Sequence, residues 1–180
     1  MHPHDDESAF KFCPVCGASL EPRVLKATEP QRLVCTNPAC EFVFYLDPKI
    51  AVGTIIRTGD HGKIVLVRRA IQPGYGKWVF PGGYVDRGEE ITVAALREAR
   101  EEAGLEIRLD HLINIYSYAG RAPVIVVYAA TMISGALEVD DESSEIREFS
   151  VGEIPWDELA FPSTRDGLRE YIEGRKSAPV

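Results

Sequence analysis

Three carboxylates are expected to lie close together on one side of a helix. Residues 89–103 are rich in Ala, Leu, Glu and Arg and contain neither Gly nor Pro, which favours an α-helix. At about 100° of rotation per residue, Glu101 and Glu102 lie about 60° and 40° to either side of Glu98. Carboxylates repel one another, but hard divalent cations such as Mg²⁺ and Mn²⁺ bind to grouped carboxylate oxygens. The pattern therefore predicts a divalent-cation site, with a solvated acidic helix face as the alternative.

The four cysteines form two pairs, Cys13 with Cys16 and Cys35 with Cys40, in a segment without a long hydrophobic run. Four thiolates in two such pairs can complete a tetrahedral zinc site. The metal would stabilise about forty residues that have little core of their own. Two disulfides or four unrelated thiols are the alternatives. Because no ligand position would remain for water, we expect this zinc to be structural.

The helix and strands that position the carboxylates are expected in a second domain that begins near residue 49. Residues 10–48 are punctuated by Cys and Pro, whereas β-branched and helical segments follow them. We therefore expect a small zinc-binding module over residues 10–48 and a mixed α/β domain over residues 49–176.

Within the α/β domain, the runs 51–58 and 63–69 flank the segment Gly59–Gly62, which predicts a hairpin. Gly104 stands directly after the helical stretch, where a helix ends in positive φ. Ser163 is expected to cap a second helix over residues 164–173. We also expect strands over residues 78–80, 105–118, 122–134 and 146–151, and a short helix over residues 155–160.

The composition is that of a soluble globular protein. The chain has 180 residues, of which 45% are hydrophobic and 27% charged, and its net charge is −8. The acidic balance argues against general binding to nucleic acid, because phosphate affinity comes mainly from Lys and Arg. A local anionic substrate remains compatible with this charge if metal ions supply the positive charge.

The sequence also indicates where the protein resides. The first ten residues are polar and acidic, so we expect no secretory signal. The most apolar stretch, Val124–Ala130, is far shorter than the ~20 residues of a membrane helix. We therefore expect a cytoplasmic, reducing location without membrane contact, which favours metal binding over disulfides for the cysteines.

The residues around the carboxylates match a known signature at fixed spacing. The segment from Gly83 to Leu105 resembles the Nudix signature G-x5-E-x7-R-E-U-x-E-E-x-G-U, in which U is apolar. The resemblance implies a Nudix α/β/α sandwich with a mixed β-sheet, preceded here by a small zinc ribbon. The fixed positions are filled by Gly83, Glu89, Arg97, Glu98, Glu101, Glu102 and Gly104, with Ala99 and Leu105 at the apolar positions.

The resemblance also implies an activity and roles for these residues. Nudix enzymes hydrolyse a nucleoside diphosphate linked to another group X, through metal-assisted attack of water on phosphorus. Metal-bound pyrophosphate is neutralised and oriented, and the pKa of the attacking water falls. The implied ligands of Mg²⁺ or Mn²⁺ are Glu98, Glu101, Glu102 and the Gly82 carbonyl. The resemblance also implies that Glu98 helps to activate water. Glu89 and Arg97 would form a charge pair that orients the carboxylates.

Segments outside the signature indicate which group of Nudix enzymes, and therefore which substrates, the chain resembles most. Bacterial NADH pyrophosphatases also combine a zinc ribbon with a Nudix domain, but they carry an SQPWPFPxS-type segment. Residues 153–163 read EIPWDELAFPS and lack SQPW, which argues against NADH-specific and RNA-decapping activity. Residues 71–90 together with 153–163 instead resemble the ADP-ribose/FAD pyrophosphatase-like group.

We therefore expect a small nucleotide substrate such as ADP-ribose, FAD or an NADH-like dinucleotide. Hydrolysis of nucleoside triphosphates in a housecleaning role is one alternative. A nucleic-acid-binding or assembly module built on the zinc ribbon is another, although the ribbon segment has a surplus of only one positive charge. The resemblance further implies a homodimer.

Several residues outside the signature are candidates for the site. Glu145 is preferred over Glu142 and Glu148 as an additional metal ligand or base, with a solvated acidic turn as the alternative. One of Arg68 and Arg69 could face the cleft and pair with phosphate, although a surface salt bridge is the alternative. Aromatic platforms for a base or flavin are offered by Tyr75, Trp78, Tyr84 and Phe161, and also by Tyr116, unless these rings belong to the core.

Overall fold

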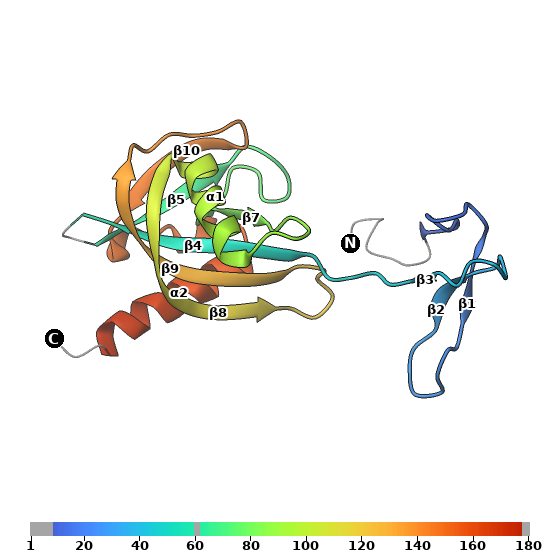
Figure 1. Ribbon diagram of the computed structural model, residues 1–180. Coiled ribbons are helices and arrows are strands. Elements are labelled where there is room, and N and C mark those ends of the chain that lie inside the picture. Colours follow the sequence, from blue (N-terminus) through green and yellow to red (C-terminus); the bar gives the residue numbers. More distant parts are fainter. Residues whose placement is uncertain (1–8, 60–61, 178–180) are drawn as a thin grey trace. The chain divides into compact units, whose positions relative to one another are not determined.

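The computed structural model describes residues 9–59 and 62–177 (Figure 1). Residues 1–8, on which the expected absence of a secretory signal largely rests, lie outside this part, as do residues 60–61 and 178–180. The chain divides into two compact units, residues 1–48 and 49–180. In the described part of the chain, no helix combines the length and apolar character needed to cross a membrane.

The first unit is a three-stranded antiparallel sheet with a very small core. Its strands are β1 (Leu20–Arg23), β2 (Arg32–Cys35) and β3 (Val43–Phe44), in the order β1-β2-β3. The fully buried hydrophobic residues of this core are Cys13, Leu20 and Cys35. So little buried apolar surface cannot stabilise a domain of this size without a further cross-link.

The second unit contains a mixed sheet of seven strands (Figure 1). Its main path runs in the order β10-β5-β4-β9-β8, with β6 paired to β5 and β7 paired to β4. Strands β4 and β9 are parallel, whereas the other pairs are antiparallel. The strands are β4 (Ile50–Thr58), β5 (Lys63–Arg69), β6 (Trp78–Val79), β7 (Gly82–Tyr84), β8 (Leu105–Ser117), β9 (Val124–Gly135) and β10 (Ser143–Phe149).

Two helices cover opposite faces of this sheet. Ile56 of β4 packs in one core cluster with Ala99 and Ala103 of α1 (Ile91–Ala103). Ile55, its neighbour, packs in another cluster with Leu168 of α2 (Pro162–Ser177). Because successive side chains of a strand point to opposite faces, α1 and α2 lie on the two sides of the sheet. The expected α/β/α sandwich with a mixed sheet is confirmed.

The edge strand β8 is long and irregular. It spans 13 residues and pairs on one side with β9. Its register against β9 shifts at three places, between Glu106 and Ile107, between Leu109 and His111, and between Leu112 and Asn114.

The boundaries of the helical segments differ from the sequence-based expectation in three places, and the strand expected over residues 146–151 spans Ser143–Phe149 instead. The first helix begins at Ile91 rather than at residue 89, because Glu90 is extended (φ −73°, ψ 137°) and forms the N-cap. Ser163 is not an N-cap: α2 begins at Pro162, whose fixed φ suits the first helical turn. The helix expected over residues 155–160 is a single 3₁₀ turn, Trp156–Glu158, and a second such turn spans Val151–Glu153.

Candidate active site and zinc site

The helix α1 presents two of its carboxylates toward the sheet. Ala95 and Ala99 are fully buried, so the helix approaches the sheet closely at small side chains. Glu98 and Glu102 share this side and are only 8% exposed. Glu101 remains largely solvent-exposed, with a side chain that is 56% accessible. The helix therefore holds two buried acids and one exposed acid beside each other.

The strand β7 supplies a glycine pair that contacts both buried carboxylates. The Gly82 N–H donates a hydrogen bond to Glu102 Oε2 at 2.7 Å. A Cβ atom on Gly83 would lie 2.5 Å from Glu98 Oε1, which is closer than any real side chain tolerates. At Gly82, a Cβ atom would collide with the carbonyl oxygen of Val52 on β4. The backbone of β4 thus excludes a side chain at Gly82, whereas a side chain at Gly83 would displace the Glu98 carboxylate.

A Gly83→Ala substitution is expected to impair the site while leaving the fold in place. The added methyl group must displace the Glu98 carboxylate, so turnover should fall at least about 10-fold and Mn²⁺ binding should weaken. Steady-state kinetics, Mn²⁺ titration and thermal melting provide the measurements. Gly152→Ala is the control, because a Cβ atom there meets nothing within 4 Å. Wild-type turnover in Gly83→Ala would contradict this interpretation of the close approach.

Arg97 connects the carboxylates of the site. It forms a bidentate pair with Glu89, from Nε to Oε1 at 2.8 Å and from Nη2 to Oε2 at 2.9 Å. Its Nη1 donates to Glu98 Oε1 at 2.7 Å and to Glu101 Oε2 at 3.0 Å, and its Nη2 also donates to the carbonyl of Tyr84 at 3.1 Å. One guanidinium therefore fixes three carboxylates, and Glu89 belongs to the site although it lies outside the helix.

The surroundings shift the protonation of these acids in opposite directions. Hydrogen bonds from Arg97 lower the pKa of Glu89 to about 2. Burial raises the pKa of Glu98, against the opposing effect of Arg97. Burial also raises the pKa of Glu102 to about 8, despite the hydrogen bond from Gly82. Burial therefore makes the charged forms of Glu98 and Glu102 costly. Two such carboxylates beside each other form a donor set suited to a hard divalent cation.

The carboxylates of α1 are less tightly gathered than the cysteines. Among the described residues, the only group of three or more potential ligand atoms within 4.8 Å of one another is formed by the four thiols. Glu98 and Glu101 are held by Arg97, whereas Glu102 is held by the backbone of Gly82.

The Glu89–Arg97 pair should make the stability of the metal-free protein depend on pH. Because the pKa of Glu89 is lowered, its contribution is fully present above about pH 4.5 and is lost as the pH falls toward 2. The melting temperature of Glu89→Gln should therefore lie below that of the wild type near neutral pH, and the difference should shrink in acid. Melting in chelator between about pH 7 and pH 3 measures this. Glu90→Gln is the control, because Glu90 forms no ion pair among the described residues. Its difference in melting temperature from the wild type should not change with pH in this way.

The ion pairs of Glu145 among the described residues are with two arginines. Its carboxylate pairs with Arg68 at 3.4 Å and with Arg147 at 3.8 Å. Within the described residues, no hydrogen bond or ion pair joins it to the carboxylates of α1, so its catalytic role stays a prediction. The acid that does bear on the cluster is Asp140, whose charge contributes to the raised pKa of Glu102. The sequence signals Asp140 only as one of several acids in the segment 138–148.

The candidate aromatic platforms fall into two groups. Trp78 and Tyr116 are core residues, at 4% and 7% exposure, and Trp78 packs edge-on against Phe149. Tyr75 and Tyr84 are exposed at 66% and 53%, and Lys49 Nζ lies 5.0 Å from the Tyr84 ring centroid. Phe161 is half-buried. The roles of all these rings in substrate binding, and that of the Gly82 carbonyl in metal binding, stay predictions.

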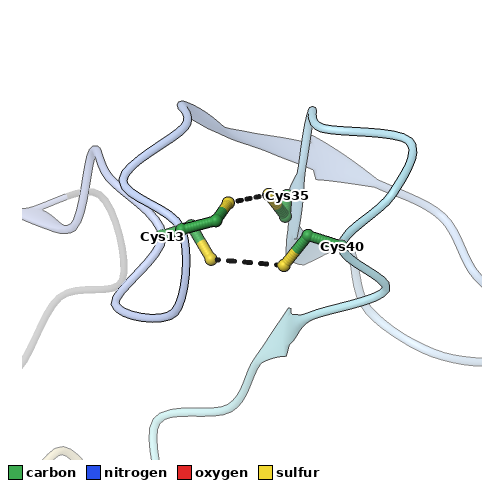
Figure 2. A group of neighbouring side chains, drawn as sticks. Cys13, Cys35 and Cys40 are labelled. Atoms are coloured by element: carbon green, nitrogen blue, oxygen red, sulfur yellow. Dashed lines mark hydrogen bonds between the residues drawn. The ribbon is translucent and has the colours of Figure 1, made fainter.

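The four cysteines of the first unit converge on one point (Figure 2). The Sγ atoms of Cys16 and Cys35 are 3.4 Å apart, and those of Cys13 and Cys40 are 3.9 Å apart. These separations exclude disulfides and surround the ~3.8 Å that zinc–sulfur bonds of ~2.3 Å require in a tetrahedron. All four cysteines are free thiols. The donor set therefore fits a zinc ion.

Backbone N–H groups around three of the cysteines donate hydrogen bonds to their sulfur atoms, which favours the thiolate form. The N–H groups of Ala18, Asn37 and Phe42 point at the sulfur atoms of the cysteines two residues before them. These bonds lower the pKa of Cys16 to about 7, whereas burial raises the pKa of Cys35 to about 12. A bound cation would remove the cost of holding negative sulfur in a buried position.

The site geometry can now be compared with known proteins. Residues 47–173 match the NUDIX domain family, over a span that includes every carboxylate of the site. The chain belongs to the Nudix hydrolase family. Residues 11–46 of this Nudix hydrolase match the Nudix N-terminal zinc ribbon family. The expected family, fold and enzyme class are confirmed.

Two curated proteins with assigned activities are similar in sequence to this Nudix hydrolase. It is 34% identical to the ADP-ribose pyrophosphatase of Methanocaldococcus jannaschii over 136 residues, which cover 73% of this chain and 78% of that protein. It is 26% identical to the NAD-capped RNA hydrolase NudC of Pseudomonas aeruginosa over 166 residues, or 91% of this chain and 54% of that protein. The chain therefore spans about half the length of the second relative.

Solved structures show the same fold. A NUDIX hydrolase from Nitrosomonas europaea superposes with a TM-score of 0.85 at 33% identity, covering 94% of this chain and 95% of the other. An ADP-ribose pyrophosphatase from Streptococcus suis gives a TM-score of 0.60 at 21% identity, covering 73% and 95%. At that identity the second likeness concerns the fold alone.

Proposed function

We propose that this Nudix hydrolase is a divalent-metal-dependent pyrophosphatase that cleaves nucleoside diphosphates linked to another group, with ADP-ribose as the first candidate substrate. The observation that carries the proposal is the buried pair Glu98 and Glu102 against the glycines of β7, with Arg97 joining Glu98 to Glu89 and Glu101. The identity to the Methanocaldococcus jannaschii enzyme supports the choice of substrate.

The carboxylates of α1 would hold the cations. Glu102 and Glu98 offer buried oxygens, and Glu101 offers an exposed oxygen on the solvent side. When bound there, Mg²⁺ or Mn²⁺ would neutralise the diphosphate and lower the pKa of the attacking water. A chain with a net charge of −8 requires such neutralisation to hold a polyanion beside three acids.

The other residues of the site hold these acids in place. Glu89 anchors Arg97 through two hydrogen bonds, so the guanidinium keeps a fixed orientation toward Glu98. Glu98 lies against Gly83, at the open backbone of β7, where its carboxylate can accept a proton from water. Arg97 and Glu89 are therefore positioning residues, whereas Glu98 would contact the reacting groups.

The decisive test is a hydrolysis panel with Mg²⁺ and Mn²⁺, in which products are identified by mass. With ADP-ribose, the expected reaction consumes one water and yields AMP and ribose 5-phosphate. Labelled water should place one solvent oxygen in one of the two product phosphates. Full activity in excess chelator, or the absence of any diphosphate cleavage, would refute the proposal.

The same panel distinguishes the remaining candidates. FAD should yield AMP and FMN if flavin dinucleotides are the preferred substrates, and NADH tests the dinucleotide class more widely. Preference for nucleoside triphosphates would indicate a housecleaning role. An NAD-capped RNA belongs in the panel, because the match to the capped-RNA hydrolase covers 91% of this chain.

A further inference from the structure

The zinc ribbon contains a groove that none of its four cysteines lines. The volume of the groove is about 400 Å³, within the range of sites that hold small molecules. Leu20 belongs to the small core of the ribbon, and Phe10 and Leu33 pack against that core. These side chains therefore give the groove an apolar wall. The lining residues are Phe10, Lys11, Leu20, Pro22, Gln31, Arg32 and Leu33.

The polar side chains of this groove are two cations and one amide. Lys11 and Gln31 are exposed, whereas Arg32 is half-buried. The guanidinium carbon of Arg32 lies 5.3 Å from the ring centroid of Tyr45, so an aromatic ring supports this cation. None of the described residues that line the groove is acidic. In a protein with a net charge of −8, the groove is therefore a locally basic place.

A third cation stands beside the groove. Strands β1 and β2 pair in a register that places Arg23 directly opposite Arg32. Like charges opposite each other in an antiparallel pair destabilise a sheet. In the described part of the chain, neither Lys11 nor Arg23 forms an ion pair with a carboxylate. An anion bound at this end of the groove would offset the repulsion between the two arginines.

We propose that the groove of the zinc ribbon binds a nucleoside monophosphate, at a second site apart from the carboxylates of α1. Lys11 and Arg32 can donate charge-assisted hydrogen bonds to the phosphate. A planar base suits the apolar wall that includes Phe10. The amide of Gln31 offers both a donor and an acceptor, as the edge of a base requires. An anion with a purely aliphatic body would leave this amide without a matching group.

Calorimetry of the zinc-loaded full chain with AMP, without added Mg²⁺ or Mn²⁺, tests this site. Wild type should bind AMP saturably, and Lys11→Gln should bind it about 10- to 100-fold more weakly, because a charge-assisted contact is lost. Lys26→Gln is the control, since Lys26 is 72% exposed and pairs with Glu29 between β1 and β2. Both variants should keep the zinc content and melting temperature of wild type. No saturable binding by wild type, or equal affinities in Lys11→Gln and wild type, overturns the proposal.

Two partial ligands test whether the groove recognises a nucleotide rather than any anion. Inorganic phosphate lacks the base and adenosine lacks the charge, so each should bind at least about 10-fold more weakly than AMP. Phosphate that binds as tightly as AMP would show a simple anion site and would overturn the nucleotide assignment.

Photolabelling separates this site from the carboxylates of α1, where AMP would be a reaction product. With 8-azidoadenosine monophosphate, peptide mapping should find the label within residues 10–33, and Lys11→Gln should reduce it. Glu102→Gln, which alters the other unit, should be labelled in the ribbon like wild type. Label confined to residues 49–177 would overturn the proposal. The inference does not depend on the proposed function, because a chain that hydrolyses nothing in the panel should still bind AMP in the ribbon.

Discussion

Glu102→Gln is expected to reduce turnover by at least about 100-fold while the protein remains folded. The substitution keeps the size and shape of the side chain, and an amide oxygen can still accept the hydrogen bond from Gly82. It removes the charge with which one of the two buried carboxylates would hold a cation. Steady-state kinetics with saturating Mg²⁺, together with Mn²⁺ titration of the variant, measure the loss.

The stability of the same variant separates a catalytic effect from unfolding. A buried carboxylate without a cation is costly, so metal-free Glu102→Gln should melt at or above the wild-type temperature. Glu106→Gln is the matched control, because Glu106 is exposed and pairs with Arg100 at the start of β8. It should retain wild-type turnover. Near-normal activity in Glu102→Gln would show that this acid does not serve the reaction.

Zinc removal is expected to unfold the first unit. We infer that one structural zinc ion binds the four thiols, and such sites contribute about 10–16 kcal/mol of apparent binding free energy near neutral pH. Cys35→Ser replaces a buried ligand in a unit with almost no other core. The variant should lose its zinc, as measured by metal analysis, and residues 11–46 should become sensitive to protease.

The second unit should respond differently to the same substitution. It has its own core around α1, α2 and the mixed sheet, so its main thermal transition should stay close to that of wild type. Val15→Ser is the control inside the ribbon, because Val15 is 68% exposed between two of the cysteines. A wild-type protein that contains no zinc, or a ribbon that resists protease in strong chelator, would count against the structural metal.

The sequence was most informative where local spacing determines geometry. Helical rotation alone places Glu98, Glu101 and Glu102 side by side, and the structure has them on one side of α1. The left-handed residue after the helix was also predictable, and Gly104 has φ 68°. Similarly, the spacing of the cysteines anticipated a cluster that the ribbon assembles.

The sequence was less informative where contacts depend on the tertiary fold. Glu145 was preferred within the acidic segment, but strand pairing of β10 with β5 places it beside Arg68. The same pairing leaves Arg69 without an acidic partner among the described residues, which no local pattern indicates. Ser163 suits a cap by residue type, but Pro162 begins the helix one residue earlier.

The irregular register of β8 has a consequence for self-association. A long edge strand, whose outer N–H and C=O groups have no partner strand, is a template on which further chains can add, as in amyloid growth. The three shifts along β8 interrupt the even row of outward N–H and C=O groups that such addition needs. This margin of the domain therefore offers a less regular template for fibril growth than an evenly paired edge strand would.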